Sequence, residues 1–131
     1  MNQRFIVLIL LCALFYGAVA LAASDSDARD AVLWKASKDP KIVAKGKDTY
    51  NSLCKNCHGE EKNTVDAPSN LFDTKWYHGG TPREIEHSIQ EGFLDKGMPP
   101  WKDALPAEDI EAVVGYLLSF QPAPNGEKPL K

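Results

Sequence analysis

The sequence predicts a small all-α domain. Three amphipathic segments with helix-start residues account for much of the chain between residues 39 and 120, and no convincing strand pattern occurs. With 131 residues, 44% of them hydrophobic, the chain is long enough for one domain with one core. Its charges are mixed along the sequence and sum to −3. Because it has no basic block and no basic helix with interleaved aromatics, we expect no nucleic-acid partner.

The first helix is expected to begin at Asp39, as the capping residue, and Pro40, at the first helical position. The residues of its inward face recur at helical spacing up to residue 53: Val43, Gly46, Tyr50 and Leu53. A glycine one turn from an aromatic residue would let a second helix approach closely. Residues 59–73 are mostly polar and are expected to form a loop.

The second helix is expected to begin at Thr81, with Pro82 in its first turn and Glu84 completing a capping box. Its inward face carries Ile85, Ser88 and Ile89, and Gly92 is expected to end it.

The third helix is expected over residues 106–120. It has the strongest amphipathic pattern of the chain, formed by Ile110, Val113, Val114, Leu117 and Leu118. Prolines and a glycine follow, so residues 121–131 are predicted to be a flexible C-terminal tail.

The N-terminus has the features of a secretory signal peptide. Arg4 precedes an apolar stretch that ends in small residues, and cleavage after Ala22 is expected, so residues 1–22 would be removed. The alternative is an uncleaved membrane anchor, although the stretch is shorter than the roughly 20 apolar residues of a membrane span. Residues 23–38 then form an N-terminal extension. Within it, the segment around Trp34 could be a helix on the core or a loosely attached arm.

The pentapeptide Cys54-Lys55-Asn56-Cys57-His58 is the attachment signature of a c-type haem. Two thiols about one helical turn apart can each form a thioether to a vinyl group, and the adjacent imidazole can ligate the iron. A Cys-x-x-Cys pair has two other interpretations. Half of a zinc site would need two further ligands, and the only other cysteine is Cys12. A redox dithiol of the thioredoxin kind would need a strand–helix–strand pattern that the chain lacks.

A haem of this type takes a second axial ligand, commonly methionine or histidine. Apart from the initiator, Met98 is the only methionine, and it lies between a glycine and two prolines that stiffen its loop. A lone methionine can also be flexible core filler. The other candidates are His78, in a loop, and His87, expected to be exposed on the second helix. Met98 is therefore the predicted ligand, with His78 as the alternative.

With these motifs assembled, residues 41–120 resemble a class I monohaem c-type cytochrome of bacteria. The resemblance rests on the haem pentapeptide, the Gly-Met-Pro-Pro-Trp run that begins at Gly97, and Gly46 with Tyr50 on the first helix. It implies an all-α, single-domain cytochrome c fold over residues 39–120, in which the N-terminal and C-terminal helices cross around a covalently bound haem. Positions 113, 116 and 117 match the opposing helix, whereas Pro106 replaces a serine common in the family.

The resemblance also implies the site. One haem c would be bound through Cys54 and Cys57, with His58 and Met98 on the iron, and the carbonyl of Pro68 would accept the imidazole N–H. Several apolar residues could line the haem or belong to ordinary core: Leu71, Trp76, Ile85, Ile89 and Trp101.

The implied function is one-electron transport by a monomeric periplasmic carrier, not an enzyme. Its partners would be redox proteins, a dehydrogenase or an oxidase, with membrane contact only through a partner or an uncleaved signal. Two alternatives stay open: a tightly bound haem subunit of a dehydrogenase or oxidase complex, and a haem sensor or enzyme whose sixth iron site is open.

Overall fold

The computed structural model describes residues 27–61, 69–73 and 75–123. Its elements are α2 (Pro40–Leu53), α3 (Lys55–His58), α4 (Pro82–Glu91), the 3-10 turn η1 (Leu94–Lys96) and α5 (Ala107–Leu118), preceded by helical residues 27–36. Across these described ranges the only extended pairing is an isolated bridge between Phe93 and Met98, so the all-α prediction is confirmed. The predicted signal peptide lies outside the described residues. Among the helices that the structure describes, none is long and apolar enough to cross a membrane.

Helix α2 begins as the sequence predicts. Asp39 Oδ1 accepts hydrogen bonds from the backbone N–H groups of Lys41, at 2.8 Å, and Ile42, at 3.4 Å, and Pro40 follows the cap. Such a cap satisfies donors that have no partner inside the helix. Leu53, in the last turn, is 42% exposed, so the apolar face ends one turn before the helix does.

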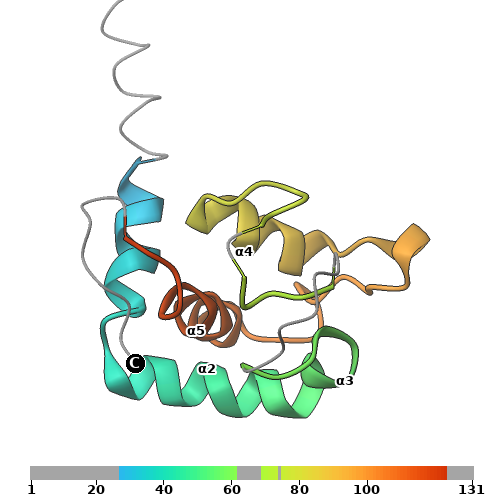
Figure 1. Ribbon diagram of the computed structural model, residues 1–131, viewed down its shortest axis with the longest axis horizontal. Coiled ribbons are helices and arrows are strands. Elements are labelled where there is room, and N and C mark those ends of the chain that lie inside the picture. Colours follow the sequence, from blue (N-terminus) through green and yellow to red (C-terminus); the bar gives the residue numbers. More distant parts are fainter. Residues whose placement is uncertain (1–26, 62–68, 74, 124–131) are drawn as a thin grey trace, which may run out of the picture.

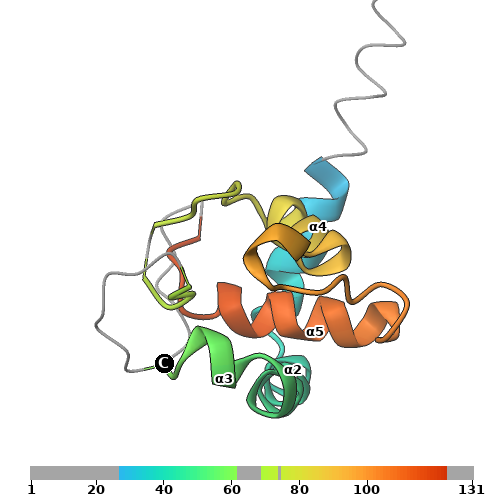
Figure 2. The same cartoon turned by 90° about the vertical axis from the view of Figure 1, so that its right-hand side faces the viewer.

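Helices α2 and α5 cross steeply and form the centre of the fold: α2 lies along the view in Figure 2, while α5 runs across it. The crossing is at Gly46. A Cβ there would lie 1.9 Å from the carbonyl oxygen of Ala112 and 2.9 Å from Cβ of Tyr116, so the two backbones touch because position 46 has no side chain. Tyr50 packs one turn further along, with its ring centroid 5.4 Å from that of Tyr116. The predicted helix pair is confirmed.

Helix α5 is shorter than expected, since it begins at Ala107 after Pro106 and ends at Leu118. Its last seven residues are all buried, which makes it the most enclosed helix in the described structure: Ala112, Val113, Val114, Gly115, Tyr116, Leu117 and Leu118.

Helix α4 lies against α5 on the side away from α2 (Figure 1). The capping box is present: Glu84 Oε2 accepts from the backbone N–H of Thr81 at 3.0 Å and from its hydroxyl at 2.8 Å. Gly92 ends the helix with φ of 63°, a left-handed conformation that favours glycine. Both predicted ends are confirmed.

The N-terminal segment (residues 27–36) is a helix packed on the core, which decides between the two expectations for it. Leu33 is fully buried and Ala36 is 3% exposed. The backbone of Ala36 approaches α5 so closely that a Cβ on Gly115 would lie 3.2 Å from its carbonyl carbon. Trp34 is half-buried beside this core.

The start of the expected C-terminal tail is also packed, which corrects the predicted boundary. Gln121 and Ala123 are 7% and 8% exposed, and Gln121 Nε2 donates to the carbonyl of Asp73 at 2.9 Å. Helix α5 has already ended at Leu118, but the buried amide of Gln121 still finds an acceptor and holds the chain on the core. Residues 124–131 lie outside the described residues.

Candidate haem site

The haem pentapeptide forms a separate helical turn. Cys54 ends α2 and precedes α3, and its carbonyl accepts from the backbone N–H groups of Cys57, at 3.2 Å, and His58, at 3.0 Å. Gly59, with φ of 79°, then turns the chain out of the helix. The two thiols and the imidazole are thereby carried by one turn, fused to the end of the helix that makes the central crossing.

Both thiols are free, with Cys54 half-buried and Cys57 exposed. Burial, and then the proximity of Cys57, raises the pKa of the Cys54 thiol to about 11. Reactive redox cysteines have lowered pKa values, so this environment is the opposite of an activated dithiol. The described residues also contain no group of three or more His, Cys, Asp and Glu side chains that could hold a metal ion, as the zinc interpretation would require.

The imidazole of His58 is oriented by a backbone carbonyl. Its Nδ1 lies 2.8 Å from the carbonyl oxygen of Ser69. An Nδ1–H that donates to this oxygen leaves the lone pair of Nε2 for a metal, the arrangement that fixes ligating histidines in metal sites. Pro68, the predicted acceptor, lies outside the described residues; the acceptor in the structure is the next residue, Ser69.

The chain beyond His58 is fastened to the central crossing by two tyrosines. Tyr50 donates to the carbonyl of Gly59 at 2.9 Å, and Tyr116 donates to Glu61 Oε1 at 2.7 Å. Lys47 Nζ lies 2.6 Å from the same Glu61 oxygen. Burial raises the pKa of both tyrosines, so their hydroxyls remain donors at neutral pH. Sequence reasoning missed Glu61, because only the fold brings it to a tyrosine 55 residues away.

Met98 lies in a loop closed on itself. The backbone N–H of Phe93 donates to the Met98 carbonyl at 2.8 Å, and the N–H of Met98 donates back at 3.1 Å. Gly97 closes the turn with a left-handed φ of 83°. The Met98 side chain is half-buried and packs against the core.

The two candidate histidines lie in different surroundings. His87 is exposed on α4, as predicted. His78 is also exposed, and its ring stacks on that of Phe93 with centroids 4.1 Å apart. Of the three candidates for the sixth ligand, Met98 is therefore more buried than His78 and His87.

The segments that carry these groups lie at one end of the helix framework. Both segments lie on the right-hand side of Figure 1, with the η1 loop above α3, and Figure 2 views this end directly. The candidate lining residues are buried or half-buried against the core: Leu71, Phe72, Trp76, Ile85, Ile89 and Trp101. Phe72, which the sequence analysis did not name, stacks edge-on against Tyr50 with centroids 5.3 Å apart.

These groups fit a haem. Two free thiols on one turn, an imidazole oriented through Nδ1 and a half-buried thioether are the donors that covalent attachment and axial ligation need. The apolar residues around them suit a large hydrophobic ring.

Comparison with known proteins agrees with this chemistry. Residues 42–117 match the family described as "Cytochrome C oxidase, cbb3-type, subunit III". The chain is 36% identical over 92 residues to the cbb3-type cytochrome c oxidase subunit CcoP of Rubrivivax gelatinosus, covering 70% of this chain and 30% of that protein. It is 30% identical over 91 residues to subunit FixP of Sinorhizobium medicae, covering 63% of this chain and 32% of the relative.

A shorter relative matches over most of its own length. Cytochrome c6 of Cladophora glomerata is 36% identical over 84 residues, which cover 60% of this chain and 89% of that protein. By contrast, the match spans about a third of the length of the CcoP and FixP subunits. No solved structure matches the chain significantly. The family match over residues 42–117 and the cytochrome c6 match show that this chain belongs to the monohaem c-type cytochromes, within the family of cbb3-type oxidase subunit III.

Proposed function

We propose that the chain binds one haem c through thioethers from Cys54 and Cys57, with His58 and Met98 as axial ligands, and transfers single electrons. The observation that carries this proposal is the α3 turn, which holds both thiols and an imidazole whose Nδ1 lies 2.8 Å from the Ser69 carbonyl. When bound, the haem iron supplies a reversible one-electron change between ferrous and ferric states.

The residues around the haem would make that change easy. The Ser69 carbonyl fixes the ring orientation of His58, and the paired backbone bonds between Phe93 and Met98 hold the thioether in its loop. With both axial positions filled by the protein, no position is open for oxygen or a small substrate. The protein is thus a carrier and not an enzyme.

The ligand set and the apolar surroundings would both shift the reduction potential of the haem in the same direction. A methionine–histidine pair raises the potential relative to two histidines. Apolar side chains disfavour the additional positive charge of the ferric state, which raises it further.

The partners are proposed to be other exported redox proteins, an oxidase or a quinoprotein dehydrogenase, with the carrier in the periplasm after removal of residues 1–22. Relatives named as oxidase subunits support an oxidase as one partner. They also favour a second candidate function, a haem subunit held permanently in an oxidase complex.

Optical spectra of the full-length chain, expressed with a c-type haem maturation system, test the ligation. We expect a sharp reduced α-band, a far-red ferric band typical of methionine ligation, and no spectral change with carbon monoxide. Met98→Ala should abolish the far-red band and lower the potential, whereas His78→Ala should keep both.

An unchanged Met98→Ala spectrum would show that another residue binds the iron. Carbon monoxide binding by the wild type would indicate an open sixth site and support the sensor or enzyme alternative. Gel filtration after mild extraction separates the two carrier roles: a monomer indicates a mobile carrier, and co-elution with other redox subunits indicates a bound one.

A further inference from the structure

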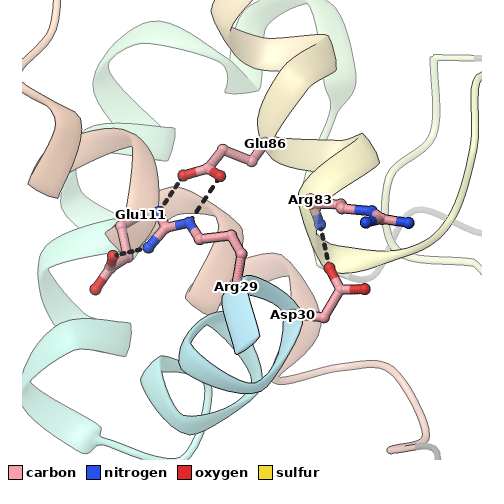
Figure 3. Close-up of polar contacts among 5 residues, drawn as sticks. All are labelled: Arg29, Asp30, Arg83, Glu86 and Glu111. Atoms are coloured by element: carbon pink, nitrogen blue, oxygen red, sulfur yellow. Dashed lines mark hydrogen bonds and ion pairs between the residues drawn. The ribbon is translucent and has the colours of Figure 1, made fainter. Parts of the chain in front are cut away.

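The N-terminal segment (residues 27–36) lies outside residues 42–117, the part of the chain that matches the family, yet it is built into the core. Its polar residues make contacts that cross the fold. Figure 3 shows Arg29 between α4 and α5, and Asp30 at the start of α4. Helices α4 and α5 are therefore joined through a segment that is far from both of them in the sequence.

Arg29 is the centre of this cluster. Its Nε donates to Glu86 Oε2 at 2.9 Å and its Nη2 donates to Glu86 Oε1, so the guanidinium engages both oxygens of one carboxylate. Its Nη1 donates to Glu111 Oε2 at 2.9 Å. Paired, charge-assisted hydrogen bonds of this kind fix orientation as well as distance.

The burial of the cluster decides how much it matters. Glu86 is 8% exposed, although a charged residue on a helix surface normally faces water. The side chain of Arg29 is 35% exposed, which weakens the pair relative to a fully buried one. Without Arg29, however, Glu86 would keep a nearly buried charge without this partner, and such a charge is costly.

Asp30 fixes α4 at a second point. Its Oδ1 accepts from the backbone N–H of Arg83 at 2.9 Å, in the first turn of the helix, one turn before Glu86. The N-terminal segment therefore fixes both the position and the rotation of α4. We call the contacts of Arg29 and Asp30 the N-terminal brace.

Helix α4 in turn positions the Met98 loop. The backbone N–H of Trp101 lies 3.2 Å from the carbonyl oxygen of Ile89, in the last turn of α4. The loop also returns against the end of the helix, because a Cβ on Gly92 would lie 2.5 Å from the carbonyl carbon of Pro99. A shift or rotation of α4 would therefore move Pro99 and Trp101, which follow Met98 in the loop.

We propose that Arg29 is a positioning residue for the Met98 ligand: through Glu86 and Glu111 it locks α4 onto α5 and keeps the Met98 loop closed on the iron. This inference rests on the proposed function, since it requires a Met98–iron bond. It assigns the N-terminal segment a role in ligation beyond the matched domain.

Competition by imidazole for the sixth iron position tests the proposal. In the ferric full-length holoprotein, imidazole must displace Met98, so its apparent affinity reports how firmly the loop is closed. We expect Arg29→Met to bind imidazole roughly threefold to tenfold more tightly, because water partly screens the Arg29 ion pairs and only part of their loss reaches the Met98 loop. Arg29→Lys, which keeps the charge but not the fork, should lie between this variant and the wild type.

The matched control is Lys35→Met, which removes one positive charge from an exposed position of the same segment. It should leave imidazole affinity unchanged. Glu111→Gln, which keeps the buried pair with Glu86, serves as a milder variant if Arg29→Met does not fold, and should give a smaller increase. Equal imidazole affinity in Arg29→Met, Glu111→Gln and the wild type would overturn the proposed role of Arg29 in positioning Met98. Absence of the far-red band in the wild type would instead overturn Met98 ligation itself, so the two failures are distinct.

Discussion

The two sides of the site are held by different forces. The side that carries Cys54, Cys57 and His58 is continuous with α2, whose backbone touches that of α5 at Gly46. The Met98 side has no such crossing. It depends on backbone hydrogen bonds within one loop and on α4, which the N-terminal brace ties to α5.

This difference indicates that the attachment side is rigid and that the Met98 side can adjust. Backbone contact at a helix crossing has almost no freedom to adapt, because nothing short of moving a helix can relieve a clash. Polar contacts can stretch, exchange with water and weaken in salt. We therefore expect the attachment side to respond to mutation through global stability and the Met98 side through ligand exchange.

The largest effect is expected at the crossing. Gly46→Val places a branched side chain where even a Cβ would lie 1.9 Å from the Ala112 carbonyl oxygen, and should lower the free energy of unfolding by about 3 kcal/mol, the upper end for overpacking. Chemical denaturation of the holoprotein measures this. Ala44→Val, at an exposed position of the same helix, controls for the helix propensity of valine and should cost only about 0.6 kcal/mol. Similar losses in both variants would show that the crossing is not where the structure has it.

A smaller effect is expected at the hydrogen bond between Tyr116 and Glu61, on the attachment side of the site. Tyr116→Phe removes the hydroxyl that donates to Glu61 at 2.7 Å and should lower the free energy of unfolding by about 1 kcal/mol. The loss is limited because Lys47 still pairs with the same carboxylate. Tyr77→Phe, at a ring that is 55% exposed, is the matched control and should have no measurable effect. If the two variants were equally stable, the tether at Glu61 would contribute nothing to the fold.

The smallest effect is expected at the surface of the Met98 side. Lys102 Nζ lies 2.8 Å from Glu91 Oε2, but both side chains are nearly half exposed, so water and salt screen the pair. Lys102→Met should leave both the unfolding transition and the imidazole affinity unchanged within error. A clear change in imidazole affinity would show that the surface pair of Lys102 and Glu91 also holds the end of α4, in addition to the N-terminal brace.

Local sequence patterns predicted the helices well. The caps at Asp39 and Thr81 and the ending at Gly92 all depend on residues near one another in the sequence. Such signals act within one or two helical turns, so they can be read directly from the chain.

Long-range polar contacts could not be predicted in this way. Arg29 finds its partners 57 and 82 residues away, and nothing around it marks the pairing. The packed Gln121 depends likewise on a carbonyl 48 residues distant. The predicted hydrogen-bond acceptor for His58, Pro68, is adjacent to the acceptor in the structure, Ser69. The ligand roles of His58 and Met98 remain predictions that a haem-bound protein must test.

A peptide map of the purified protein, expressed with a c-type haem maturation system, tests directly whether Cys54 and Cys57 bind haem covalently. We expect the peptide containing Cys54 and Cys57 to carry the mass of one covalently bound haem after denaturation. Replacing both cysteines with alanine should remove that mass. Recovery of the wild-type peptide with two free thiols, after expression under conditions that attach haem to a known c-type cytochrome, would contradict covalent haem attachment at this motif.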